Sequence, residues 1–149
     1  MTPEETTAIK VVERLRNHGH IAYFAGGCVR DRLLGVEAKD YDIATDATTD
    51  QVRAIFPRTI PVGVHFGVIL VVLDEIHCEV ATFRTDGRYR DGRHPSEIHF
   101  GSPREDALRR DFTINGMFYD PLTGKVIDYV GGIEDLRRCI IRAIGDPVC

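Results

Sequence analysis

A pair of glycines separates two segments of different character in the first quarter of this 149-residue chain. The segment before Gly26 and Gly27, from His20 to Ala25, is short, aromatic and β-prone, which predicts a strand. The segment after them, Cys28 to Leu34, predicts a short helix. Asp40 to Ala44 then predicts a second strand. A strand, a tight turn, a helix and a returning strand therefore constrain how the rest of the chain can fold.

This unit carries residues that suit phosphate and metal chemistry. On a strand, Asp40 and Asp42 would share one face, and two carboxylates about 7 Å apart repel each other unless a cation lies between them. Mg²⁺ prefers oxygen ligands and tolerates phosphates. The backbone at Gly26 and Gly27 can approach a phosphate, and Arg30 can donate to its oxygens. Each pattern alone is more typical of an ordinary turn or loop, but together they favour a metal-dependent phosphoryl or nucleotidyl site.

The remaining elements indicate an α+β or mixed α/β fold. A turn at Asp74-Glu75 predicts a hairpin, so the sheet is not purely parallel, and the polar segment from Arg84 to Ser102 predicts a long loop. We expect helices over 3–18, 49–56, 103–108, 109–119 and 133–138, and further strands over 62–73, 76–83, 126–129 and 139–144.

Composition excludes several classes of protein. With 43% hydrophobic and 28% charged residues, the chain is typical of one soluble domain, and no apolar run approaches the roughly 20 residues of a membrane span. The first residues lack the layout of a secretory signal, so we expect a cytoplasmic protein without membrane partners. The net charge of -4 argues against a globally basic nucleic-acid binder. Of 19 basic residues only three are lysines, and this excess of arginine suits phosphate contacts or reflects genomic base composition.

Two further segments could add to the site. Glu79, on the second strand of the hairpin, is either a third metal-binding carboxylate or an exposed strand residue. In the predicted helix 109–119, Arg110 could neutralise a triphosphate while Asp111 orients it, and Asn115 would lie nearby. The alternative is a solvated helix face.

Four segments, taken in order, resemble a single family. They are GGCVRDRLLGVEAKDYD, EVATFRTDGRYRDGRHP, EDALRRDFTINGM and GGIEDLRRCIIR. Together they are similar to the motifs of class II tRNA nucleotidyltransferases and bacterial poly(A) polymerases. The resemblance implies that residues 1–149 form a polymerase-β-like nucleotidyltransferase head domain with a mixed, mostly antiparallel sheet and flanking helices. The family's neck, body and tail domains, including its base-selecting E-D-x-x-R motif, are expected to be absent from this chain.

The resemblance also implies roles for individual residues. Asp40 and Asp42 match the family's Mg²⁺ ligands, and Glu79 matches its third catalytic carboxylate. The implied reaction transfers AMP or CMP from ATP or CTP to an RNA 3′-hydroxyl, with the tRNA 3′ end as the expected acceptor. Gly116 replaces a common alanine and is expected to loosen the helix 109–119 by about 0.5–1 kcal/mol. The residues expected to bind the nucleotide are Gly26, Gly27, Arg30, Arg110, Asp111 and Asn115.

Three other functions remain open from the sequence. A poly(A) polymerase would share the same head domain and add an open tail of A. A catalytically incomplete nucleotide-binding module would bind ATP with Mg²⁺ and release no pyrophosphate. A small-molecule nucleotidyltransferase would use the same core on another acceptor, although the RRDFTIN segment disfavours it.

Overall fold

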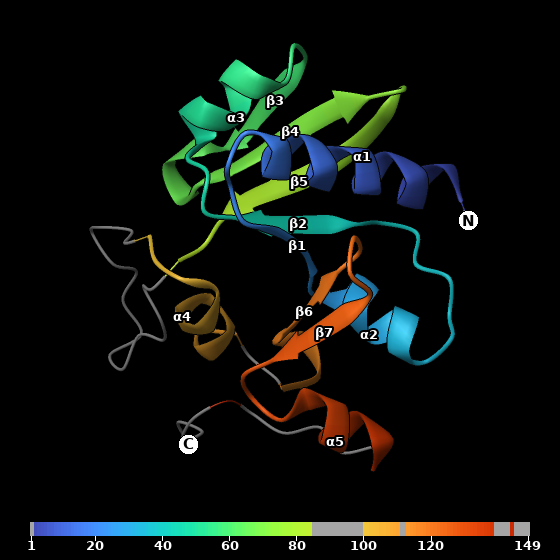
Figure 1. The fold of residues 1–149 in the computed structure, drawn as a ribbon. Helices are drawn as coiled ribbons and strands as arrows, with labels where there is room; N and C mark the ends of the chain where they lie inside the picture. Colours follow the sequence, from blue (N-terminus) through green and yellow to red (C-terminus); the bar gives the residue numbers. More distant parts are fainter. Residues whose placement is uncertain (1, 85–99, 111–112, 139–143, 145–149) are drawn as a thin grey trace.

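The fold is a seven-stranded sheet with helices on both faces, seen in the computed structural model of Figure 1, which describes residues 2–84, 100–110, 113–138 and 144. The strand order is β3-β4-β5-β2-β1-β6-β7. All neighbouring strands run antiparallel except β2 and β5, which are parallel. The predicted mixed, mostly antiparallel sheet is confirmed. The strands are β1 (Ala22–Ala25), β2 (Asp42–Thr45), β3 (Thr59–Gly63), β4 (Val68–Leu73), β5 (Ile76–Thr82), β6 (Met117–Asp120) and β7 (Lys125–Asp128).

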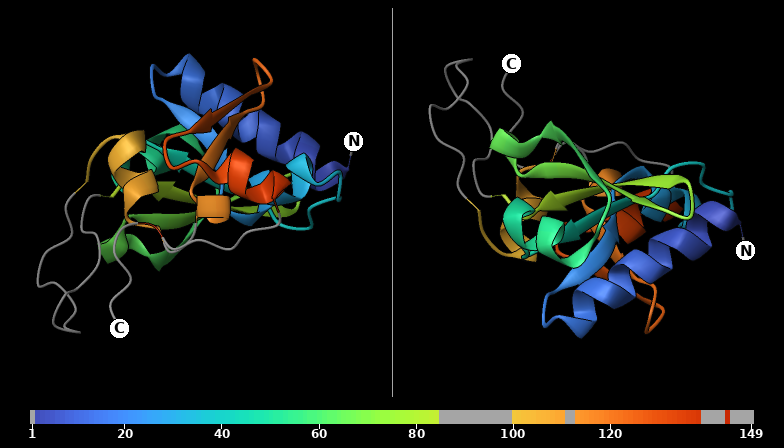
Figure 2. Two further views of the ribbon diagram at one scale, coloured as in Figure 1. Left: turned by 90° about the horizontal axis from the view of Figure 1, so that it is seen from below. Right: turned by 90° about the horizontal axis from the view of Figure 1, so that it is seen from above.

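The helices divide the core into two parts. Phe24, Ile43 and Val80 point to the larger cluster, which α1 and α3 complete. The next residues along two of these strands, Ala25 and Ala44, belong to a smaller cluster that α4 joins, since alternate strand residues face opposite sides of a sheet. Figure 2 shows α1 and α4 on different sides of the strands. The helices are α1 (Pro3–Asn17), α2 (Gly27–Leu33), α3 (Thr49–Ile55), α4 (Pro103–Leu108) and α5 (Gly132–Arg137), with 3₁₀ turns η1 (Val64–Phe66) and η2 (Thr113–Asn115).

Capping residues fix where several helices begin. The Thr2 hydroxyl accepts a hydrogen bond from the Glu5 backbone N–H at the start of α1. Thr48 and Ser102 form capping boxes at α3 and α4. Among the helices described, none has the length and apolarity needed to cross a membrane.

The predicted hairpin is confirmed, but a strand boundary was wrong. Asp74 and Glu75 adopt φ of 52° and 62° and connect β4 to β5, as two-residue hairpin turns require. In contrast, β2 begins at Asp42, so Asp40 precedes the strand. The chain around Asp40 has no strand partner, because the antiparallel pairing of β1 with β2 ends at Ala25 and Asp42.

The predicted helix 109–119 was wrong. Helix α4 ends at Leu108, η2 forms one turn, and the chain then enters β6. Tertiary pairing overrides helix propensity here, because Phe118 pairs with Ala25 of β1 and is fully buried. Gly116 therefore lies in a bend and loosens no helix. A Cβ atom at Gly116 would lie 3.0 Å from Val130 Cγ2, which accounts for a small residue there. The strand predicted over 139–144 lies, apart from residue 144, outside the described residues.

Candidate active site

The centre of the candidate site is a pair of carboxylates on the two parallel strands. Asp42, the first residue of β2, is the direct neighbour of Glu79 in β5. Neighbouring strands lie about 4.8 Å apart, and paired residues point to the same face. Both residues reach solvent, whereas the residues that follow them, Ile43 and Val80, are buried in the larger core cluster. The sheet therefore holds Asp42 beside Glu79, a pairing that sequence spacing did not reveal.

The surroundings of Asp42 raise its pKa to about 6. The largest cause is burial, which disfavours the ionised form, and the second is repulsion from Glu79. Arg110 acts in the opposite direction, and Asp40 adds a smaller repulsion. The other two predicted carboxylates are thus both close enough to act on Asp42.

The residues around Asp42 could hold a cation that also contacts a phosphate. Within the described part of the chain, no set of three His, Cys, Asp or Glu side chains is arranged to enclose a metal ion. Mg²⁺, however, is usually held by one or two carboxylates, with phosphate oxygens and waters completing its shell. The repelling pair Asp42 and Glu79, with Asp40 beside it, fits an ion of this kind.

The glycine turn lies against the same carboxylate. Gly26 has a φ of 73°, a conformation that favours glycine, and a Cβ atom there would lie 3.7 Å from Asp42 Oδ2. Gly27 begins α2, so backbone N–H groups of the first turn lie beside Asp42 without a capping side chain. The predicted association of the turn with Asp42 is seen in the geometry.

Arg30 is held beside this turn by residues from two elements. Its Nη1 donates to Asn115 Oδ1 at 3.2 Å, and its Nε and Nη2 lie 3.4 Å from Asp31 Oδ1. Asn115 belongs to η2, so the structure joins two predicted site residues that are 85 positions apart in the chain. A guanidinium oriented in this way can donate to phosphate oxygens.

Arg110 also lies close enough to Asp42 to lower its pKa. It lines a pocket of about 180 Å³ together with Asp42, Glu79, Arg84 and Arg109. Sequence reasoning missed Arg84 and Arg109, because the chain just after β5 and the end of α4 meet only in the folded chain. The predicted residue Asp111 lies outside the described residues.

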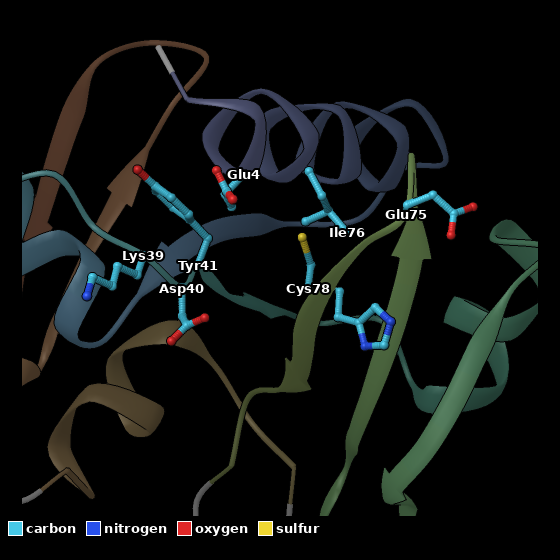
Figure 3. A pocket seen from close by; sticks show the side chains of 8 residues that line it. Glu4, Lys39, Asp40, Tyr41, Glu75, Ile76 and Cys78 are labelled. Carbon is cyan, nitrogen blue, oxygen red and sulfur yellow. The ribbon is translucent and has the colours of Figure 1, made fainter.

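Two further pockets adjoin the acids. One, of about 400 Å³, is lined by Gly27, Asp40 and Asp42, with Cys28, Asp31, Val36, Glu37 and Lys39. The other, of about 350 Å³, is shown in Figure 3, where Glu4 comes from α1, and Ile76 and Cys78 come from β5. In this view the Asp40 carboxylate points away from the Tyr41 hydroxyl. Lys39 and Asp40 line both pockets, so the segment before β2 separates them.

Two buried thiols lie close to the carboxylates in the chain or in space. Cys28 and Cys78 are free and buried, and burial raises the pKa of each to about 11. The Cys28 thiol donates to the Ala25 carbonyl at 3.1 Å. They are therefore neutral, structural groups near neutral pH.

Comparison of this chain with known proteins identifies its family. Residues 22–142 match the model of the poly A polymerase head domain, and the chain belongs to that family. Among its relatives is the CCA-adding enzyme of Bacillus pumilus, 50% identical over 145 residues, which cover 97% of this chain and 36% of that protein. The CCA-adding enzyme of Geobacillus stearothermophilus is 47% identical over 147 residues, covering 98% and 36%. The chain thus spans about a third of the length of these relatives.

Solved structures agree with this assignment. The crystal structure of the Bacillus stearothermophilus CCA-adding enzyme in complex with CTP matches with a TM-score of 0.86 and 44% identity, over 97% of this chain and 34% of that chain. The Thermotoga maritima CCA-adding enzyme complexed with tRNA-CCA matches with a TM-score of 0.73 and 25% identity, over 97% and 34%. The predicted head-domain fold is confirmed.

Proposed function

We propose that residues 1–149 form the nucleotidyltransferase portion of an enzyme that adds CCA to tRNA. The observation that carries this proposal is the pairing of Asp42 with Glu79 on adjacent parallel strands, between a glycine turn and a pocket lined by arginines. The relatives named CCA-adding enzymes support it. In the proposed reaction the RNA 3′-oxygen bonds to the α-phosphorus of ATP or CTP, and the bond to the β-phosphate oxygen breaks, releasing pyrophosphate.

The three acids have a proposed role in holding Mg²⁺. Asp42 and Glu79 would bind it, with Asp40 adding negative charge beside them. When bound, Mg²⁺ lowers the pKa of the attacking hydroxyl and offsets charge on the leaving pyrophosphate.

The basic and glycine residues have a proposed role in binding the triphosphate. Gly26 and Gly27 place no side chain between their backbone and a phosphate, and Arg30, oriented by Asn115, would donate to it. Arg110 would place positive charge where the triphosphate charge shifts during transfer. Asp111 keeps its proposed role in orienting the nucleotide on the resemblance alone.

We propose that base selection and most RNA binding depend on regions outside these 149 residues. We also propose that the protein acts in the cytoplasm. The buried free thiols Cys28 and Cys78 support a reducing compartment. The family description also favours one alternative, a poly(A) polymerase with the same head domain.

A chimaera tests the proposal. This chain would replace the matching third of the Geobacillus stearothermophilus enzyme, whose remaining two thirds stay unchanged. With tRNA lacking its 3′ end, ATP, CTP and Mg²⁺, we expect product sequencing to show addition of CCA and then a stop. Asp42→Asn should lose at least about 100-fold in rate. An open A tail would favour the poly(A) alternative, whereas nucleotide binding without pyrophosphate release in a folded chimaera would favour the binding module.

A further inference from the structure

A buried carboxylate lies next to the site without facing it. Asp106, in α4, is 1% exposed, which is rare for an aspartate unless its charge is compensated. Its two oxygens accept four hydrogen bonds from three residues of the same region. Oδ1 accepts from the Arg84 backbone N–H at 2.9 Å and Arg109 Nε at 3.0 Å. Oδ2 accepts from Arg110 Nε at 3.2 Å and Nη2 at 2.9 Å.

These contacts fix the direction of two guanidinium groups. Arg109 and Arg110 lie three and four residues after Asp106, and the end of α4 brings all three side chains together. The arginine side chains are about one-fifth exposed. Asp106 accepts hydrogen bonds from Nε and Nη2 of Arg110 but not from Nη1. The two arginines therefore retain donor groups that can face the pocket.

Both arginines face the carboxylate pair. They line the 180 Å³ pocket that Asp42 and Glu79 also line. Two arginines and one aspartate leave a net positive charge on this wall, opposite two acids that would be neutralised by a bound cation. Such a wall suits a phosphate group.

Asp106 also fixes the chain where β5 ends. Its bond to the Arg84 N–H lies beside the bridge between Arg84 and Phe100, so one carboxylate joins α4 to the end of β5. A plain stabilising ion pair at a helix end would need no such second contact. The arrangement is therefore suited to holding the arginine wall at a fixed position relative to Glu79 on the same strand.

We propose that Asp106 is a positioning residue for nucleotidyl transfer, which sets the place of Arg109 and Arg110 on the pocket wall where a phosphate of the reacting nucleotide or RNA meets positive charge. This inference rests on the proposed function. Asp106 acts through the arginines and does not contact the reactants.

The test uses the chimaera described above, with Asp106→Asn as the main variant. Asparagine keeps the shape and one acceptor oxygen but loses the charge that holds Arg110. We expect kcat/KM to fall about 100-fold, the effect of a small displacement of a group that meets the reacting phosphates. A rise in KM for CTP assigns the contact to the nucleotide, a rise in KM for tRNA assigns it to RNA, and a fall in kcat alone assigns it to the transition state.

A control variant and a double-mutant cycle distinguish a positioning role of Asp106 from a purely stabilising one. Glu134→Gln removes an exposed carboxylate that pairs with Arg138 at the same spacing, and it should change neither melting temperature nor kcat/KM. In the background Arg109→Gln/Arg110→Gln, adding Asp106→Asn should lower kcat/KM by less than about threefold, because residues that act as a unit are not additive.

Two results would overturn the inference. One is a folded Asp106→Asn chimaera with unchanged kcat and KM values, and the other is a full loss that persists in the background lacking both arginines. If Asp106→Asn melts below the assay temperature, Arg110→Lys decides, since lysine keeps the charge without the planar fork. Unchanged kinetics for Arg110→Lys would then overturn the inference. An unmutated chimaera that adds no nucleotide would instead contradict the proposed function.

Discussion

Asp42 shows how a single residue can be costly to the fold and useful to the site. It lies between Glu79 on the neighbouring strand and the turn at Gly26, and repulsion and burial raise its pKa to about 6. An apolar or amide side chain would fit the same place with less repulsion. Strain of this kind is a feature of functional sites, where groups are placed for a ligand and not for the stability of the ligand-free chain.

Asp42→Asn should therefore stabilise the chain in the absence of metal. The folded-state pKa is raised, so the folded state binds more protons than the unfolded state between pH 4 and 6, and stability falls as pH rises through that range. Above pH 6 we expect Asp42→Asn to gain about 1 kcal/mol, a value reduced for solvent screening. The gain should vanish near pH 4. Urea unfolding at pH 4 and pH 7.5 measures it, with Asp50→Asn on the exposed start of α3 as a control. If Asp42→Asn changed the free energy of unfolding by the same amount at both pH values, the raised pKa assigned to Asp42 would be contradicted.

At the scale of elements, α5 is packed unusually close to η2. A Cβ atom on Gly132 would lie 2.3 Å from the Thr113 carbonyl oxygen, and the Thr113 hydroxyl donates to Asp135 at 2.6 Å. Since η2 carries Asn115, which orients Arg30, the docking of α5 on η2 also positions a residue of the candidate site.

Gly132→Ala should consequently disturb both stability and the site. The collision is with backbone, which cannot move aside, so we expect a loss of about 2–4 kcal/mol in unfolding free energy. Gly131→Ala is the matched control, because Gly131 has open space around it and a φ of 82° that costs alanine only about 1 kcal/mol. Chemical denaturation of the two variants checks the difference. A smaller loss for Gly132→Ala than for Gly131→Ala would refute the close packing.

A second link between elements joins α1 to β6 through Arg16 and Asp120. Arg16 Nη2 lies 2.7 Å from Asp120 Oδ2, and the Leu122 backbone N–H donates to Asp120 Oδ1 at 2.9 Å. Burial by itself would raise the pKa of Asp120, but the hydrogen bonds, that from Arg16 first, lower it overall. The link therefore stabilises the fold when Asp120 is ionised.

Asp120→Asn should lose this stabilisation in a pH-dependent way. Because the folded-state pKa is depressed, the contribution is present above the unfolded pKa of about 3.9 and is lost as pH falls through the folded value. We expect a loss of about 1–2 kcal/mol at pH 7 that narrows below pH 3. Asp74→Asn, in an exposed pair with Lys10, should cost almost nothing. Melting curves from pH 2.5 to 7 test this, and a loss independent of pH would exclude the ion pair as its cause.

At the scale of the whole molecule, the described pockets offer groups that suit phosphates and cations. The charged residues that line them beside Asp42 are mainly carboxylates and arginines, which suit the cation and the phosphates common to all nucleoside triphosphates. The chain on its own is therefore expected to bind a triphosphate without selecting the base.

The isolated chain should thus be stabilised equally by different nucleotides. With Mg²⁺, ATP, CTP, GTP and UTP should each raise the melting temperature by the same few degrees, because ligand binding to the folded state stabilises it by mass action. Inorganic pyrophosphate should reproduce most of the shift, and adenosine none. Thermal shift at matched concentrations measures this. A shift for CTP and ATP several degrees larger than for GTP and UTP would show base selection within the chain.

Local chemistry in the sequence determined much of this protein. The glycine turn, the capped helices, the hairpin at Asp74-Glu75 and the carboxylates of the site all follow from residue types and short spacings, which act over a few positions. The wrong prediction of a helix over 109–119 also has a physical cause. The segment 109–119 has helix-compatible residues, yet Phe118 and Tyr119 gain more by pairing with β1 and filling the core than by continuing α4.

The family resemblance grouped these distant residues in one site, but only the tertiary structure showed which of them lie side by side. The parallel pairing of β2 with β5 places Asp42 directly beside Glu79, which lies 37 positions later in the chain. The spacing of the two residues in the sequence does not predict this pairing. Arg109 and Arg110, which Asp106 holds, reach the same pocket because α4 packs on the opposite face from α1. Such contacts depend on strand order and helix packing, which arise from burial of the whole core and leave no short pattern in the sequence.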